Sequence, residues 1–243
     1  MSLLPWLLRW QPPDDRTRFA AGLHAGSAVG VALALRDDVR TLTPAQVRRL
    51  ALSSVPAGVA GLLVGDVVER RLGRPGPTAA LLAGAGLALL IADRHADSPS
   101  PDPHARDHRK SSPTRSGPDL PRSRGLAAGD GLGVAAAAQV VALAPGVSRT
   151  GATLTALRAQ GVDREEALRA SLLMSLPVTL GAALLTAVRG RTAPPLVPTA
   201  VAGVTAYAAA RRVRPTQGFV TGSVLYRLAV AAAVAVRLRR ERA

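Results

Sequence analysis

Residues 145–153 interrupt an apolar part of the chain with a sequence suited to binding an anion. They read PGVSRTGAT, and so combine a helix breaker, two glycines, three hydroxyl side chains and one arginine. A charged side chain between two short apolar segments is costly in a bilayer, so its presence indicates a functional site. An ordinary surface loop that caps a helix is the alternative interpretation, and the residues alone leave it open.

The side chains of this turn suit a phosphate group. A guanidinium such as that of Arg149 meets phosphate oxygens through two parallel hydrogen bonds, and glycines let backbone N–H groups approach an anion. A half-helix that begins near Gly151 would direct the positive end of its dipole to the same place. Each hydroxyl could bind phosphate or cap that helix. The candidate phosphate-binding residues are Gly146, Ser148, Arg149, Thr150, Gly151 and Thr153, of which Arg149 and Ser148 are the candidate catalytic residues.

The composition indicates a membrane protein. Of the 243 residues, 48% are hydrophobic but only 2% are aromatic, so small aliphatic residues and glycine supply most of the apolar character. Small residues let helices approach closely in lipid. The net charge of +15 could indicate nucleic-acid binding, but the arginines lie mostly between apolar segments, where anionic lipid headgroups explain them better. The chain contains no cysteine, which excludes disulfides and thiolate metal sites.

Two apolar segments, 131–144 and 151–159, flank the Pro-Gly break and are each too short to span a bilayer, which takes roughly 17–25 residues. They predict a re-entrant hairpin that enters and leaves on one side. Irregular backbone at membrane depth must be buried in protein or line a wet cavity, so we expect a polar cavity at the turn. Gln139 would line that cavity or bond another helix. The six predicted transmembrane helices are 19–35, 50–65, 77–92, 167–188, 196–210 and 219–236.

Residues 93–125 form a polar segment rich in Pro, Ser, Arg and Asp, without apolar periodicity. Such a composition cannot bury a core, so we expect a disordered linker. This linker divides the chain into a first membrane repeat, 1–92, and a second, 126–243, which carries the hairpin. Three of the four histidines lie in it at spacings that match no metal-ligand pattern: His95, His104 and His108.

The two halves share one short pattern, in which Ser54-Val55-Pro56 parallels Ser175-Leu176-Pro177. Three spans in each half would invert the second repeat relative to the first, an arrangement that places ligand sites near the bilayer midplane. The predicted fold is therefore an all-α polytopic membrane protein with inverted repeats, about six transmembrane helices and one re-entrant hairpin. The loops 36–49, 93–125, 158–169 and 211–214 would share one side, which is expected to be cytoplasmic because it holds more Lys and Arg.

The turn and its surroundings resemble the undecaprenyl-diphosphatase family, the bacitracin-resistance membrane phosphatases. Gln139 followed by the string 145–153 is similar to the second signature of that family. Residues 161–177 continue in the family's order, Phe219 with Tyr226-Arg227 resembles its last helix, and residues 23–27 and 56–62 match its early spans. The likeness covers nearly the whole chain outside the linker.

The resemblance implies hydrolysis of undecaprenyl diphosphate to undecaprenyl phosphate and phosphate, which recycles the lipid carrier for peptidoglycan synthesis. It also implies a multi-pass protein of the bacterial plasma membrane, Mg²⁺ or Ca²⁺ as cofactor with unknown ligands, and no nucleic-acid partner. A non-hydrolytic lipid-phosphate binding protein, or a flippase or transporter of the same fold, is the alternative.

The family's first signature, a re-entrant segment with glutamates, serines and a histidine thought to handle acid–base chemistry, is not found, because residues 1–10 already resemble the stretch after it. Asp130 begins the second hairpin. His24, the only histidine within a predicted span, is expected to pack and bond a neighbouring helix. Either the natural start lies upstream, or the chain is a divergent member without hydrolase activity, and as written we expect little or no hydrolysis. The glutamates all lie in predicted loops or the tail: Glu69, Glu165, Glu166 and Glu241.

Overall fold

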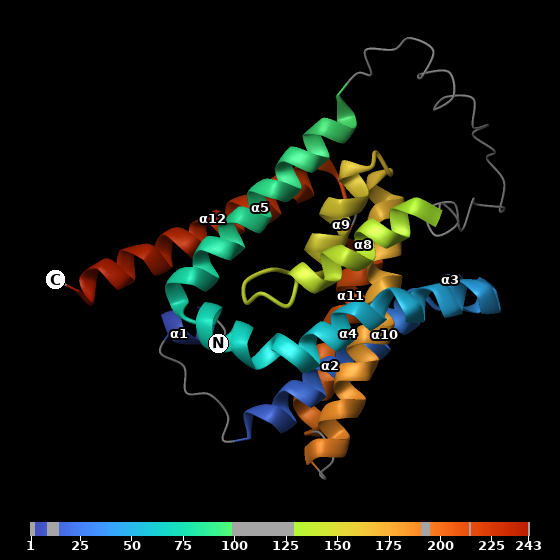
Figure 1. Cartoon of the computed structure of the whole chain (residues 1–243), viewed down its shortest axis with the longest axis horizontal. Helices are drawn as coiled ribbons and strands as arrows, with labels where there is room; N and C mark the ends of the chain where they lie inside the picture. Colours follow the sequence, from blue (N-terminus) through green and yellow to red (C-terminus); the bar gives the residue numbers. More distant parts are fainter. Residues whose placement is uncertain (1–2, 9–14, 99–128, 191–194, 214, 243) are drawn as a thin grey trace.

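The computed structural model describes residues 3–8, 15–98, 129–190, 195–213 and 215–242. Every regular element in these residues is an α-helix, as the sequence predicts (Figure 1). The hairpin formed by α8 and α9 contacts α4, α5 and α10. The helices are α1 (Leu3–Leu7), α2 (Arg16–Ala34), α3 (Arg36–Thr41), α4 (Pro44–Leu72), α5 (Pro75–Asp97), α8 (Gly129–Val141), α9 (Arg149–Ala159), α10 (Arg164–Gly190), α11 (Leu196–Arg212) and α12 (Gln217–Arg240).

Four helices in the described residues are long and apolar enough to cross a membrane: α4, α5, α10 and α12. The other two predicted spans form α2 and α11, with 19 and 17 residues, and do not reach that length and hydropathy. α2 begins with Arg16 and Arg18 and carries His24 in its middle, which lowers its apolar character. Several apolar spans in one chain make it a multi-pass membrane protein.

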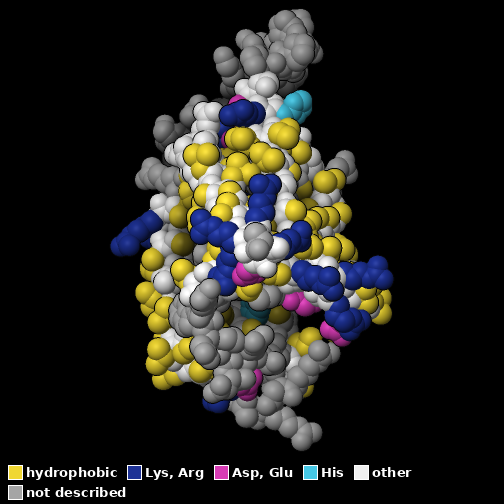
Figure 2. Space-filling model, turned by 90° about the vertical axis from the view of Figure 1, so that its left-hand side faces the viewer, with side chains coloured by type: hydrophobic (Ala, Val, Ile, Leu, Met, Phe, Trp, Pro, Cys, Tyr) yellow, Lys and Arg dark blue, Asp and Glu magenta, His cyan; other side chains and the backbone are white. Residues whose placement is uncertain are grey.

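The outer surface of the helices is apolar, as a lipid environment requires. Leu62 and Leu63 of α4 are 63% and 75% exposed, and Val204 of α11 is 69% exposed. Hydrophobic side chains cover much of the face in Figure 2, while basic side chains gather in a band across it. Exposed leucines and valines at this density suit contact with acyl chains rather than water.

The long helix α4 begins at a capping box, six residues before the predicted span 50–65. The Thr43 hydroxyl accepts a hydrogen bond from the Gln46 N–H at 3.3 Å, and the Gln46 side chain accepts one from the Thr43 N–H at 2.8 Å. This capping box, with Pro44 at the first helical position, satisfies amides that the first turn leaves unpaired. Pro56 and Pro177 lie inside α4 and α10 without ending either helix.

Small residues let α2 and α11 pack backbone to backbone. A Cβ at Gly26 would lie 2.0 Å from the carbonyl oxygen of Thr199, and one at Gly30 would lie 2.2 Å from that of Gly203. Glycines four residues apart share one face of a helix, so this face of α2 has no side chains at these positions and α11 packs directly against its backbone.

The two halves pack on each other in matching pairs. The first long helices of the halves, α2 and α10, are in contact, and so are the third ones, α5 and α12. Such pairing is what a two-fold relation between the repeats would produce, although the inverted repeat itself stays a prediction. The short pattern that suggested it does not align them, because Pro56 lies in the second helix of its half and Pro177 in the first.

The end of α5 differs from the linker that the composition predicts. The helix continues through Asp97, and Asp93 is only 1% exposed. An Asp93 carboxylate oxygen accepts hydrogen bonds from Nε of Arg158 at 2.7 Å and from Nε of Arg164 at 2.9 Å. The predicted linker was therefore wrong for residues 93–97, because partners more than sixty residues away bury its first acidic side chain. Residues 99–125 of that linker lie outside the described residues.

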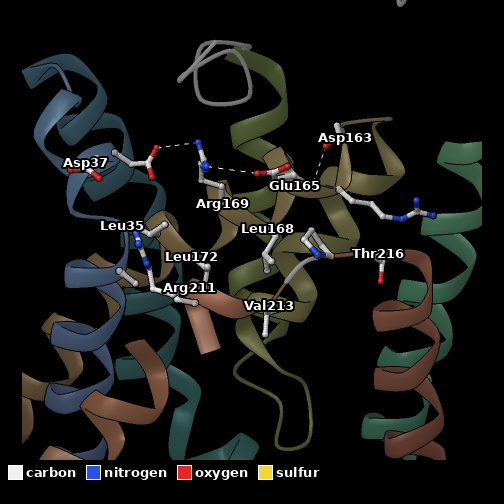
Figure 3. A pocket seen from close by; sticks show the side chains of 15 residues that line it. Leu35, Asp37, Asp163, Glu165, Leu168, Arg169, Leu172, Arg211, Val213 and Thr216 are labelled. Atoms are coloured by element: carbon white, nitrogen blue, oxygen red, sulfur yellow. Dashed lines mark hydrogen bonds and ion pairs between the residues drawn. The ribbon is translucent and has the colours of Figure 1, made fainter. Parts of the chain in front are cut away.

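Three of the loops predicted to share one side do meet. Arg169 of α10 pairs with Asp38 of α3 at 3.3 Å, and both line a cavity of about 740 Å³ (Figure 3). Arg211, Val213 and Thr216, around the end of α11 and the start of α12, line it as well. None of the predicted phosphate-binding residues lies in this cavity, so it is distinct from the turn.

Candidate functional site

The predicted hairpin is present, and its turn lies between two short helices. α8 ends at Val141, irregular backbone follows, and α9 begins at Arg149 rather than near Gly151. In Figure 1 the turn is the loop beside α5 and α4. The chain reverses through Gly146, whose φ of +94° is a conformation that favours glycine.

Gly146 also lets the turn rest directly on α5. A Cβ at this position would lie 2.3 Å from the carbonyl oxygen of Thr78. Thr78 is 2% exposed, and its hydroxyl donates to the carbonyl oxygen of Leu72 at 2.9 Å. The sequence predicts that Gly146 lets an amide reach an anion, whereas the structure assigns it the close approach to α5.

The first turn of α9 presents unpaired amides. Ser148 is the N-cap, and its hydroxyl accepts a hydrogen bond from the Gly151 N–H at 3.2 Å. Within the described residues, the N–H groups of Arg149 and Thr150 donate to no acceptor. A helix end with free amides favours negative charge, so the dipole argument from the sequence applies here. Ser148 itself is exposed, which leaves its own O–H proton able to reach a ligand.

The Arg149 side chain extends from this turn to α10. Its Nη1 donates to the hydroxyl oxygen of Thr179 at 3.4 Å, while that hydroxyl donates to the Ser175 carbonyl oxygen at 2.7 Å. Arg149 is half-buried, and no carboxylate in the described part of the chain pairs with it. A single long bond to a neutral hydroxyl leaves most of the guanidinium donors available.

A second arginine approaches the same helix end from α12. Arg227 is half-buried, and its Nη2 would lie 2.9 Å from a Cβ placed on Gly151. Its Cδ lies against α5, 3.2 Å from where a Cβ of Gly86 would be. The described residues provide no carboxylate for Arg227 either. The sequence analysis matched Tyr226-Arg227 to the family's last helix but did not place Arg227 in the site, and the other available signal was one arginine within an apolar segment.

Two further predicted site residues, Thr153 and Gln139, are buried and hydrogen-bonded within the protein. The Thr153 hydroxyl donates to the carbonyl oxygens of Arg149 and Thr150, each at 3.1 Å, and Thr153 is 1% exposed. Its prediction as a phosphate ligand is not supported by this position, because the hydroxyl is committed to its own helix. Gln139 is also 1% exposed and donates from Nε2 to the Ser53 carbonyl oxygen at 3.2 Å. Of its two predicted roles, the structure shows the bond to another helix, α4.

His24 makes no hydrogen bond with any described residue, contrary to the prediction that it bonds a neighbouring helix. The ring is half-buried, and the charge of Arg149 acts on it. α2 therefore contributes a histidine with free ring nitrogens to the surroundings of the turn.

The expected Mg²⁺ or Ca²⁺ has no ligand set in the described part of the chain, where no group of three or more His, Asp or Glu side chains could hold a metal ion. The polar side chains described at the turn are those of arginine, serine and threonine, with His24 in its surroundings. The side chain of Asp130, at the start of the hairpin, is not among those that the structure describes. The divalent cation stays a prediction.

The chain is similar in sequence to known proteins of one family. The family described as bacitracin resistance protein BacA matches residues 1–233. An undecaprenyl-diphosphatase of Geobacter metallireducens is 33% identical over 201 residues, covering 76% of this chain and 66% of that relative. One of Trichlorobacter lovleyi is 32% identical over 232 residues, covering 85% and 76%, and one of Mycolicibacterium paratuberculosis is 33% identical over 190 residues, covering 68% and 59%.

The chain spans about two thirds of the length of several of these curated relatives. The match nevertheless extends over nearly the whole chain, including the turn and most of the last helix. The chain belongs to the bacitracin resistance protein BacA family.

Proposed function

We propose that this chain hydrolyses undecaprenyl diphosphate to undecaprenyl phosphate and inorganic phosphate in the bacterial plasma membrane, in place of the little or no hydrolysis expected from the sequence. The reaction would recycle the lipid carrier for peptidoglycan synthesis and would support resistance to bacitracin. The relatives named undecaprenyl-diphosphatase support the substrate, and the apolar helices support its delivery from the bilayer.

The observation that carries the proposal is a pair of half-buried arginines without counter-ions. Arg149 and Arg227 both lie at the first turn of α9, and no described carboxylate neutralises either one. Charge removed from water is costly unless it is paired, so the site is complete only when an anion occupies it. A diphosphate brings several negative oxygens, which suits two guanidiniums better than a single carboxylate would.

The geometry assigns separate tasks to the residues. Arg149 and Arg227 would hold the phosphoryl oxygens from two sides, and the free amides of Arg149 and Thr150 would bind the same group along the helix axis. In hydrolysis a water oxygen forms a bond to the terminal phosphorus while the bond to the bridging oxygen breaks. Negative charge then develops on the bridging oxygen, and fixed guanidiniums stabilise it without reorganising.

Release of phosphate from undecaprenyl diphosphate by the purified full chain in detergent tests the proposal, with binding of the lipid measured beside it. Arg149→Ala should lower release on the order of a hundredfold, as removal of one donor to a developing anion does. Arg40→Ala, which removes an exposed arginine of α3, is the matched control and should behave as the native chain. Normal turnover in Arg149→Ala would exclude Arg149 from the mechanism. Lipid binding without any release by the native chain would favour the non-hydrolytic alternative.

A further inference from the structure

His24 occupies the face of α2 that is turned toward α10. Val31 and Leu35, seven and eleven residues further along, share that face and pack in the core with Leu173 and Leu176 of α10. Gly22 and Gly26 lie on the opposite face, against α11. His24 therefore continues the row of side chains that meets α10.

The register between α2 and α10 brings His24 close to the depth of the Arg149 contact. The two helices are antiparallel, because Asp38, just after α2, pairs with Arg169 near the start of α10. Moving away from the Asp38–Arg169 pair, one reaches His24 along α2 and Thr179 along α10. Thr179 is the residue whose hydroxyl accepts the hydrogen bond of Arg149. At about 1.5 Å per residue, the ten residues from Arg169 to Thr179 span about 15 Å and the fourteen from Asp38 back to His24 about 21 Å, so the two positions differ in depth by about one helical turn.

The surroundings of the ring suit an anionic ligand. Among the described residues, no carboxylate pairs with His24 and no group hydrogen-bonds to it, and the charge that acts on the ring is the positive one of Arg149. A neutral imidazole always has one N–H to donate, and a half-buried polar ring without a partner is costly. A phosphoryl oxygen held by Arg149 would satisfy that donor.

We propose that His24 is a further substrate-contacting residue, whose ring donates a hydrogen bond to the phosphoryl group held by Arg149. The inference rests on the proposed function, since the ligand is the diphosphate of the same site. The sequence interpretation of His24 as a packed structural histidine is replaced by a role in binding. α2 of the first half and α9 of the second half then hold one ligand together.

The four histidines of the chain allow a direct test. In His95→Gln/His104→Gln/His108→Gln, His24 is the one remaining histidine, so ring ¹⁵N labelling of the purified full chain in detergent reports on it alone. Addition of methylenediphosphonate, a diphosphate that cannot be hydrolysed, should shift the ring ¹⁵N resonances of His24. The same addition to the version that also carries Arg149→Ala should leave them in place.

Affinity for the same probe gives an independent readout. His24→Ala should weaken binding of methylenediphosphonate about tenfold, as loss of one hydrogen bond to a charged group does. His95→Ala, at an exposed histidine near the end of α5, should bind as the native chain does. The resonance experiment keeps the inference testable if His24→Ala does not fold.

The outcomes separate the two proposals. Binding that depends on Arg149, with unmoved His24 resonances, would overturn the role of His24 and leave the proposed function standing. Failure of the native chain to bind either methylenediphosphonate or undecaprenyl diphosphate would overturn both.

Discussion

The guanidinium of Arg227 occupies the space that a side chain at residue 151 would fill, since a Cβ on Gly151 would lie 2.9 Å from Nη2. A glycine is therefore required at position 151 of the turn because Arg227 of α12, seventy-six residues further along the chain, fills the space beside it. Its N–H is bonded to the Ser148 hydroxyl, so its absent side chain matters more than its amide. This contact joins the hairpin to the last helix at the site.

Substitution of Gly151 tests that contact. Gly151→Ala should displace Arg227 and lower affinity for methylenediphosphonate several-fold, while alanine itself favours the helix. Titration of the purified chain with this probe measures the effect. Gly133→Ala in α8 is the matched control, because a Cβ there meets nothing within 4 Å and affinity should not change. Equal affinity in both variants would show that Arg227 does not depend on the space at Gly151.

Removal of Arg227 should weaken binding of the same probe more strongly. Loss of a charge-assisted hydrogen bond costs about 1.5–3 kcal/mol, which corresponds to roughly ten- to a hundredfold in affinity. Arg227→Lys should recover only part of this loss, since an ammonium cannot form the two parallel bonds of a guanidinium. Arg212→Ala, an exposed arginine at the end of α11, serves as the control. Full affinity in Arg227→Ala would mean that Arg227 only packs between α5 and α9.

The two possible roles of Ser148, cap and ligand, can be separated. Ser148→Ala removes the N-cap of α9 and should lower the free energy of unfolding by about 1 kcal/mol. Ser148→Asn keeps a capping oxygen and should retain stability, yet it removes the hydroxyl proton and should lower phosphate release. Thermal unfolding in detergent and the release assay measure the two effects. Native release by Ser148→Asn would restrict Ser148 to capping.

The hairpin was predictable from sequence because its signal is local. A Pro-Gly break, a capping serine and one arginine between short apolar runs carry their meaning within a few residues. Arg227 carries no such signal, since one arginine in an apolar segment could equally extend its head to the membrane interface. Only the packing of α12 against α5 and α9 places it at the site.

The differences between the sequence predictions and the structure at Asp93 and Thr153 have the same cause. Asp93 is predicted to begin a polar linker because the residues that follow it are polar. Its ion-pair partners, Arg158 and Arg164, belong to the other half of the chain and give no signal near Asp93 in the sequence. Thr153 is predicted to be a phosphate ligand because it lies in the signature. In the structure it lies one turn into α9, and its hydroxyl donates to the carbonyl oxygen of Arg149 in the same helix. Composition and spacing report on local structure, whereas burial depends on residues distant in sequence.

The buried charges around Asp93 provide a last prediction, on stability. Asp93→Asn should lower the free energy of unfolding by about 3–5 kcal/mol, because it leaves Arg158, which is 3% exposed, with too little negative charge. Asp97→Asn is the matched control on the same helix end. The Asp97 side chain is 41% exposed and also pairs with Arg158 and Arg164, so water screens its contribution to about 1 kcal/mol or less. Thermal unfolding of both variants in detergent compares them directly, and equal losses would show that burial does not set the strength of this network.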